Sequence, residues 1–199
     1  MKSSWPKIAL TIVSACLGTT ALAQDATIKI GVNQPLTGVV AASGNMVTAG
    51  TKIAAEEINA KGGVLGKKLQ LVIEDNKSNP TEAAGVAEKL ITSDKVPAMI
   101  GAWSSTYTLA VMPKLLEYKI PMIVETSSAD KITTSGNPYV FRISPTNGTE
   151  AKSFTRFIEP LAIKKADFLV VNNDWGLGAA AEFGKMLKEK GVTVNRSLN

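Results

Sequence analysis

Two clusters of serine and threonine hydroxyls are the groups in this sequence best suited to holding a small polar molecule. Ser104 and Ser105 belong to the first cluster, and Thr126, Ser127 and Ser128 form the second. Each cluster closely follows a short apolar run that predicts a β-strand. Hydroxyls and free backbone N–H groups at a helix N-terminus can bind a carboxylate, although hydroxyl residues also cap helices. Two clusters after neighbouring strands favour a small carboxylate-bearing ligand more than either one alone.

Trp103 and Trp175 lie in loops of the same kind, each just beyond a predicted strand. An indole in an exposed loop often lines a binding surface, because it combines a large apolar face with one hydrogen-bond donor. It can equally anchor the loop to the core beneath. The sequence leaves both interpretations open for both residues.

The residues that most catalytic sites need are missing from the sequence. It contains no histidine, which excludes Ser-His and Cys-His nucleophiles and the usual zinc ligand, and its single cysteine is Cys16. The segment 62–68 imitates a phosphate-binding loop, but its glycine spacing is one residue short and neither Ser nor Thr follows the lysine. No G-x-G-x-x-G follows the first predicted strand. We therefore expect a binding protein and not an enzyme, with no metal and no cofactor.

The charge pattern argues against nucleic acid as a partner. The formal net charge is +5, but basic residues alternate with acidic ones and are not interleaved with aromatic residues. Charged residues make up 20% of the chain and hydrophobic residues 45%, as in ordinary folded globular proteins. The expected partner is therefore a small molecule.

Residues 1–23 have the pattern of a secretory signal peptide. Lys2 and Lys7 provide a positive start, the apolar stretch that follows is too short to span a bilayer, and small residues at a cleavage site end at Ala23. The alternative is a lipobox that ends at Cys16, whose lipidation would anchor the protein to a membrane. Both interpretations predict export, and we expect a periplasmic protein.

Beyond residue 23, short apolar strands alternate with amphipathic helices. The predicted strands are 28–34, 69–75, 97–101, 121–124, 139–144, 166–172 and 192–197. The predicted helices are 47–60, 80–91, the stretch from the 104–108 loop to Leu116, 149–161 and 178–190. This alternation is typical of βαβ units, so we predict an α/β fold with a mostly parallel sheet and right-handed crossovers. Such sheets bind ligands beyond the carboxyl ends of their strands, where both hydroxyl clusters and both tryptophans lie.

Several segments of the chain are more distinctive than this general pattern. They are 28–38, 54–80, 101–108, 121–130 and 139–147. Together they resemble the leucine/isoleucine/valine-binding protein family, the type I periplasmic binding proteins of branched-chain amino acid ABC transporters. The resemblance implies two flavodoxin-like (Rossmann-like) parallel-sheet lobes that close around a ligand by hinge motion.

The same resemblance implies a division of the chain. Residues 24–143 would form the first ligand-binding lobe, and residues 144–148 the first hinge crossing. Residues 149–199 would begin a second lobe that is incomplete at Asn199, because family members are about twice this length.

The resemblance also implies roles for individual residues. Ser105 should bind a ligand carboxylate through its hydroxyl and N–H, and Ser128 should contact the ligand through the same two groups. Thr126 should offer its carbonyl oxygen to an ammonium group, and Trp175 should cover the ligand from the second lobe. Ser43 stands where amino acid binders often carry a tyrosine.

Glu125 is a second departure from the family, at a position where many relatives carry an uncharged residue. With Ser43, it leaves the identity of the ligand open. Trp103, Ser104 and Ser127 complete the predicted ligand-binding set.

We therefore predict a solute-binding protein that captures a small carboxylate-bearing solute, a branched-chain or other amino acid, between two lobes. It would deliver this solute to an ABC permease in the inner membrane, and we expect it to act as a monomer. The alternative is a sensor domain of the same fold in a receptor or regulator. An aromatic acid, an amide or urea are alternative ligands.

Overall fold

The computed structural model describes residues 27–198 and confirms the predicted α/β fold. The strands of this part of the chain are β1 Ile28–Gln34, β2 Leu69–Asp75, β3 Met99–Gly101, β4 Met122–Val124, β5 Val140–Arg142, β6 Lys165–Leu169 and β7 Thr193–Leu198. The helices are α1 Ala41–Ala60, α2 Pro80–Thr92, α3 Ser105–Tyr118, α4 Lys131–Thr134, α5 Asn147–Ile158 and α6 Asp174–Glu189, with a 3₁₀ turn at Glu159–Leu161.

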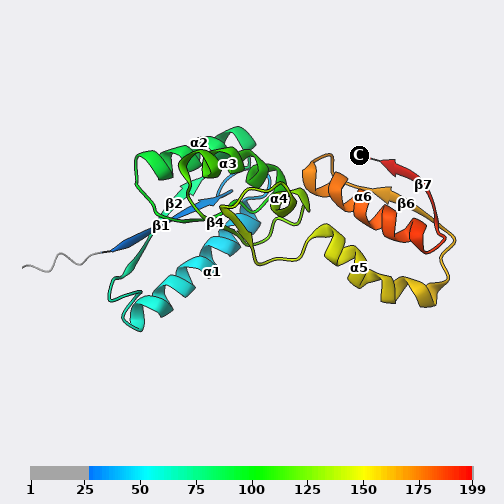
Figure 1. Cartoon of the computed structure of the whole chain (residues 1–199), viewed down its shortest axis with the longest axis horizontal. Helices are drawn as coiled ribbons and strands as arrows, with labels where there is room; N and C mark the ends of the chain where they lie inside the picture. Colours follow the sequence, from blue (N-terminus) through cyan, green and yellow to red (C-terminus); the bar gives the residue numbers. More distant parts are fainter. Residues whose placement is uncertain (1–26, 199) are drawn as a thin grey trace, which may run out of the picture.

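The main sheet has five strands in the order β2-β1-β3-β4-β5, and all four pairings are parallel. The chain leaves β1 in one direction, through α1 to β2, and then crosses back through α2 to β3. Because right-handed crossovers in opposite directions place their helices on opposite faces, α1 covers one face while α2 and α3 cover the other (Figure 1). The direction changes at β1 and β3, whose carboxyl ends are the expected place for a ligand.

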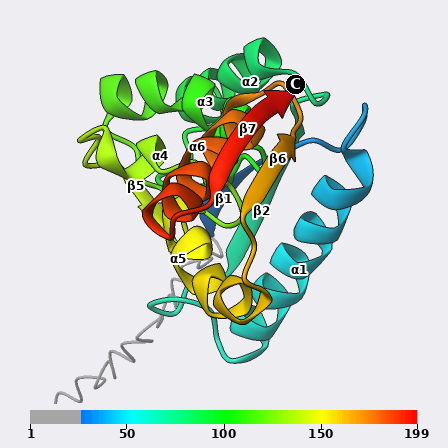
Figure 2. The ribbon, with the colours of Figure 1, turned by 90° about the vertical axis from the view of Figure 1, so that its right-hand side faces the viewer.

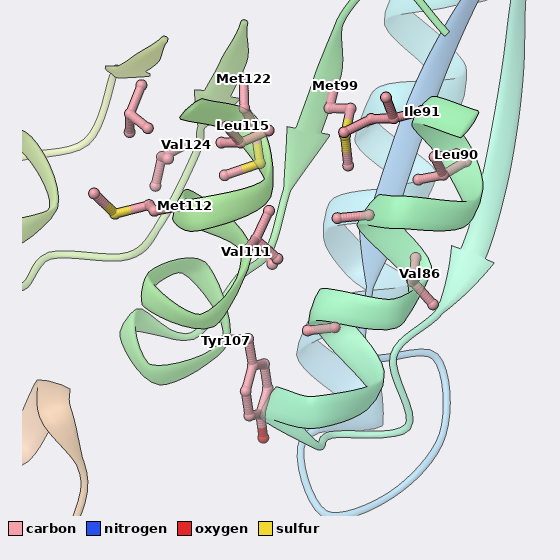
Figure 3. Close-up of a cluster of buried hydrophobic side chains, with 14 of the residues drawn as sticks. Val86, Leu90, Ile91, Met99, Tyr107, Val111, Met112, Leu115, Met122 and Val124 are labelled. Atoms are coloured by element: carbon pink, nitrogen blue, oxygen red, sulfur yellow. The ribbon is translucent and has the colours of Figure 1, made fainter. Parts of the chain in front are cut away.

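The core of this sheet lies between its strands and the helices α2 and α3 (Figure 3). This cluster includes Val86 and Leu90 of α2, Val111 and Leu115 of α3, and Met122 of β4. A spacing of four residues keeps each helical pair on one face of its helix. Each fully buried side chain of this size contributes about 1.5–3 kcal/mol to folding, so this cluster holds the strand ends in place.

The chain leaves the main sheet after β5 and enters a second, smaller unit at α5 (Figure 1). There β6 and β7 form a parallel pair, and α5 and α6 pack against each other beside it (Figure 2). The buried side chains of this smaller core are Ala151, Ile158, Met186, Leu187 and Val192. The loop between β5 and α5 is therefore the covalent connection between the two sheets.

Three helices begin earlier than the sequence predicts, α5 by only two residues and α1 and α6 by more. α1 begins at Ala41 and not at residue 47, because Gly44 allows its first turn to lie against Pro35: a Cβ there would be 2.1 Å from the Pro35 carbonyl oxygen. Val40 precedes the helix and has no side chain able to cap it, so the sequence carries no start signal. α6 begins before residue 178 because the side chain of Asn173 accepts a hydrogen bond from the Gly176 N–H at 2.9 Å.

Two further differences concern short elements. α4 was not predicted, because a single turn at Lys131–Thr134 is too short to show helical periodicity. The strand predicted at 166–172 occupies Lys165–Leu169, so the loop that precedes α6 is longer than expected.

The predicted signal peptide, including Cys16, lies outside the described residues and stays a prediction. Among the helices within 27–198, none is long and apolar enough to cross a membrane.

Candidate functional site

The loop after β3 brings the first hydroxyl cluster to the edge of the sheet. Gly101 ends the strand so close to β1 that a Cβ would lie 2.5 Å from the Asn33 carbonyl oxygen, and Trp103 has a left-handed φ of 63°. The loop turns sharply into α3 as a result. Ser104 is the residue before the helix, and Ser105, the first helical residue, is almost completely buried.

The N-terminus of α3 differs from those of α2, α5 and α6 in its capping. In each of those three helices, the side chain of the residue before the helix accepts a hydrogen bond from a first-turn N–H group; these residues are Asn79, Thr146 and Asn173 respectively. Ser104 makes no such bond at α3. The first N–H groups of α3 therefore keep their hydrogen-bonding capacity for another acceptor.

The structure brings the two hydroxyl clusters together. Thr126 and Ser127 each donate a side-chain hydrogen bond to the Trp103 carbonyl oxygen, both at 2.9 Å. The Ser105 hydroxyl accepts a bond of 3.1 Å from the Ala129 N–H. The loops after β3 and β4 thus form a single hydrogen-bonded edge, as their neighbouring strand ends predict.

The members of this edge differ in what their hydroxyls do. The Ser127 hydroxyl is buried, and it pairs with Thr108 Oγ1 at 2.7 Å as well as with Trp103. It holds the two loops together, and a ligand contact by this hydroxyl stays a prediction. Thr126 is exposed at the surface of the edge. The Ser105 hydroxyl acts only as the acceptor in its bond with the Ala129 N–H, so that bond leaves the hydroxyl proton available to another acceptor.

Ser128 is tied to the second unit through Asn147, a residue that the sequence analysis did not select. The Ser128 hydroxyl donates to Asn147 Oδ1 at 2.8 Å, and the Asn147 N–H donates to the Ser128 carbonyl at 2.7 Å. Asn147 Nδ2 then donates to the carbonyl oxygen of Trp175 at 3.4 Å. Asn147 is fully buried, so it joins the loop after β4 to the starts of both α5 and α6.

The start of α6 makes two more contacts with the first unit. Lys131 of α4 forms an ion pair with Asp174, and this hydrogen bond is the main cause that lowers the pKa of the Asp174 carboxyl. The Asp174 N–H donates to Thr106 Oγ1 at 3.2 Å. Neither Lys131 nor Asp174 could be selected from sequence, because the two residues are far apart along the chain.

The remaining predicted residues have distinct environments. Trp103 is half-buried and packs against the main core, which supports its interpretation as a loop anchor. Trp175 is 47% exposed in the first turn of α6, where its indole is accessible. Ser43 is partly buried in the first turn of α1, a helix and not the loop that was predicted there.

Arg142 of β5 supports the edge from below. Its Nη1 donates to the carbonyl oxygens of Ala129, at 2.8 Å, and Ser127, at 3.2 Å, and its Nη2 donates to Thr133 Oγ1. Burial lowers the pKa of the guanidinium, and the charge of Asp130 opposes that effect. A planar fork with several donors can hold carbonyls in this way, and a lysine cannot.

Glu125, which in sequence is only a departure from the family pattern, lies beneath the loop after β3. Its Oε1 accepts bonds from Gln34 Nε2, at 2.7 Å, and from the Trp103 N–H, at 3.2 Å. Burial raises the pKa of the carboxyl above its usual range, and these hydrogen bonds oppose the rise only in part. Within residues 27–198, no group of three or more His, Cys, Asp or Glu side chains could hold a metal ion.

The sequence matches a known family over the whole described part of the chain. A model of the periplasmic binding protein family matches residues 27–198. The chain is similar to the Leu/Ile/Val-binding protein BraC3 of Rhizobium johnstonii, with 32% identity over 171 residues, 84% of this chain and 46% of the relative. It is equally similar to the leucine-, isoleucine-, valine-, threonine- and alanine-binding protein of Pseudomonas aeruginosa, with 32% identity over 169 residues, 84% of this chain and 45% of the relative. The chain spans about half the length of the curated relatives it matches.

Solved structures of solute-binding proteins have the same fold as the described part of the chain. The leucine-binding protein LivK of Thermotoga maritima matches with a TM-score of 0.80 and 33% identity, over 86% of this chain and 49% of that one. LivJ of Streptococcus pneumoniae, in complex with isoleucine, matches with a TM-score of 0.78 and 32% identity, over 87% and 50% of the two chains. A solute-binding protein of Rhodopseudomonas palustris, in complex with 3,4-dihydroxybenzoic acid, matches with a TM-score of 0.78 and 27% identity, over 86% and 47%.

Proposed function

The chain belongs to the periplasmic binding protein family, and we propose that it is the solute-binding component of an ABC importer. In this function it captures a small carboxylate-bearing solute and presents it to a permease in the inner membrane. The family is one of binding proteins, and the proposal requires no chemical step on the solute.

The observation that carries the proposal is the edge formed by the loops after β3 and β4. At this edge the uncapped N-terminus of α3 lies beside the Ser105 hydroxyl, and both are held in place by the Ala129 N–H and the Trp103 carbonyl. Free N–H groups and a hydroxyl at a helix start suit a carboxylate, and the helix dipole favours its negative charge. Ser128 adds a backbone N–H on the opposite loop.

We propose an amino acid, branched-chain or other, as the first class of ligand to test. Relatives named for leucine, isoleucine and valine, and a related structure with isoleucine bound, support this choice. The carbonyl oxygen of Thr126, at the exposed end of the edge, would accept from the ammonium group. The related structure with 3,4-dihydroxybenzoic acid supports an aromatic acid as the second class, because both classes share the carboxylate.

The division of the chain follows from the same proposal. Residues 24–143 would be the first lobe, residues 144–148 the hinge crossing, and residues 149–199 the beginning of the second lobe. Trp175 would cover the solute from that second lobe, with Ser43 on the other side of the cleft. Export by cleavage after Ala23, or anchoring at Cys16, would place the protein in the periplasm, where we expect it to act as a monomer.

A titration followed by tryptophan emission tests the proposal. The panel contains branched-chain and other amino acids, aromatic acids, and amides with urea. Ser105→Ala should weaken binding of the carboxylate-bearing class by about tenfold or more, because a hydrogen bond to a charged group is lost. Ser93→Ala is the matched control, since Ser93 is exposed at the end of α2. Equal affinities of the Ser105 and Ser93 variants would contradict the assignment of the carboxylate to α3.

A further inference from the structure

Gln34, which is buried, and Glu125, which is partly buried, form a pair at the carboxyl ends of β1 and β4. Gln34 is the last residue of β1 and has no exposed surface, and Glu125 directly follows β4. One hydrogen bond of 2.7 Å joins them, from Gln34 Nε2 to Glu125 Oε1. The pair lies under the loop that carries Ser104 and Ser105, because the Trp103 N–H also donates to Glu125 Oε1.

The two remaining oxygens of this pair are unsatisfied. Gln34 Oε1 and Glu125 Oε2 are both buried, and neither has a hydrogen-bond partner in the part of the chain that the structure describes. If Glu125 were ionised, both atoms would be acceptors without a donor, and one of them would share a negative charge. Rotating the Gln34 amide would not help, because its oxygen would then face Glu125 Oε1, which is also an acceptor.

A single proton on Glu125 Oε2 would give both unsatisfied oxygens a hydrogen bond. We infer that Glu125 is protonated and uncharged in the folded protein, with its carboxyl paired head-to-head with the Gln34 amide. In this arrangement the amide N–H donates to Oε1 of the carboxyl, and the carboxyl O–H on Oε2 donates to Oε1 of the amide. Each group gives one hydrogen bond and accepts one, so every polar atom of the pair is satisfied.

The charged groups on the neighbouring strand ends make their own contacts and do not favour the ionised form of Glu125. Asp75 at the end of β2 accepts its bonds from the 36–37 loop, from Thr37 Oγ1 and from the Lys77 N–H. Arg142 of β5 donates to the carbonyls of the loop after β4. The influences on the pKa of Glu125 are burial, which raises it, and the weaker opposing effects of Gln34 and backbone N–H groups. Among residues 27–198, no cation therefore compensates a charge at this position.

This inference deepens the proposed function and, for its consequence on ligands, rests on it. An ionised Glu125 beneath the start of α3 would repel a carboxylate bound there, and a neutral Glu125 does not. The pair therefore makes the site suitable for solutes with a net charge of zero or minus one. It also means that Glu125 is not the acceptor for a ligand ammonium group, because Oε2 is buried and Oε1 already accepts two hydrogen bonds.

Infrared spectroscopy of the ligand-free protein tests the inference without using the proposed function. At neutral pH we expect a protonated-carboxyl C=O band in the wild type and in Glu56→Gln, and its loss in Glu125→Gln. Glu56 is exposed on α1 and serves as the matched control. A wild type without this band would overturn the inference, and that result requires no variant to fold.

Thermal unfolding as a function of pH provides a second test. A folded-state pKa raised above the unfolded one makes the wild type lose stability as the pH rises from the unfolded-state pKa of about 4.3 up to the folded-state pKa, and Glu125→Gln removes this loss. The melting temperature of the wild type should therefore fall relative to that of Glu125→Gln over this range. A difference that is constant, or that grows in favour of the wild type, would overturn the inference.

Ligand binding separates the two proposals. We expect Glu125→Gln to bind the carboxylate-bearing solute within about twofold of the wild type, because the amide is a neutral replacement for the neutral acid. A gain of tenfold or more would show that Glu125 carries a charge in the wild type and would overturn the inference. If no solute binds while the infrared band is present, the proposed function fails and the assignment of the proton to Glu125 stands.

Discussion

Lys131 and Asp174 form an ion pair that joins the two units of the chain, with 2.5 Å between Nζ and Oδ1. Lys131 begins α4 beside the main sheet, and Asp174 begins α6 in the smaller unit. A hollow beside this pair is lined from both units, by Thr134 on one side and by Leu177 and Ala181 on the other. The pair therefore stabilises the arrangement in which Trp175 lies close to the edge formed by the loops after β3 and β4.

If solute binding requires this arrangement, removing the ion pair should weaken binding. An exposed pair contributes about 0.2–1 kcal/mol, so Lys131→Ala should raise the Kd by about 1.5- to 5-fold. The exchange of both charges in Lys131→Asp with Asp174→Lys should restore part of the loss in a double-mutant cycle. Lys77→Ala is the control, because the ion pair of Lys77 with Glu82 lies entirely within the first unit. An equal loss in the control would mean that the Lys131 pair has no specific role.

Asn147→Ala should destabilise the protein by about 1–3 kcal/mol. The substitution leaves the buried Ser128 hydroxyl without its acceptor and removes the link to the Trp175 carbonyl. Denaturant unfolding measures the change. Asn45→Ala is the control, because Asn45 makes its hydrogen bonds on the exposed side of α1 and should change stability much less. Similar values for both variants would show that the Asn147 contacts contribute little.

Leu115 and Leu116 are neighbours in α3 with opposite environments, 0% and 52% exposed respectively. Leu115→Ala should cost about 2–5 kcal/mol, because it leaves a cavity in the core between α2 and α3. Leu116→Ala should change the free energy of unfolding by about 0.5 kcal/mol or less. Urea unfolding of the two variants checks the core directly, and a smaller cost at Leu115 would contradict the packing in Figure 3.

Arg142→Lys should loosen the loop after β4 although it keeps the positive charge. The arginine fork contacts the Ala129 and Ser127 carbonyls and Thr133 together, whereas a lysine can replace only part of this set. We expect a loss of about 1.5–3 kcal/mol in stability and faster amide hydrogen exchange at residues 127–129. Arg156→Lys, on the surface of α5, is the control and should leave exchange in that loop unchanged.

The Asp75 carboxyl gives a pH dependence of the opposite sign to that of Glu125. Burial raises the pKa of Asp75, but hydrogen bonds from Thr37, Lys77 and Leu36 outweigh it and hold the pKa below its usual value. A lowered folded-state pKa contributes stability above about pH 4 that is lost as the pH falls further. Asp75→Asn should therefore flatten the loss of stability in acid. An acid-unfolding curve unchanged in Asp75→Asn would mean that other carboxylates cause that loss.

The fold could be predicted well from the sequence because its signals are local. Apolar residues spaced by four, such as Val86 with Leu90, marked the helix α2 that covers the core. Helix starts were less predictable: α1 begins where Gly44 permits close approach to Pro35, and that depends on a contact between two elements. A single turn such as α4 has no periodicity to detect.

The sequence by itself determined which hydroxyls follow which predicted strands along the chain. It did so because parallel strands bring their carboxyl ends to one edge, whatever the side chains do afterwards. Only the tertiary structure decided how those side chains are used. Ser127 holds two loops together, Ser128 is bonded to Asn147, and two oxygens of the Gln34–Glu125 pair lack a hydrogen-bond partner among the described residues. Such pairings join residues far apart in sequence, so they depend on sheet register and loop path, which no local pattern encodes.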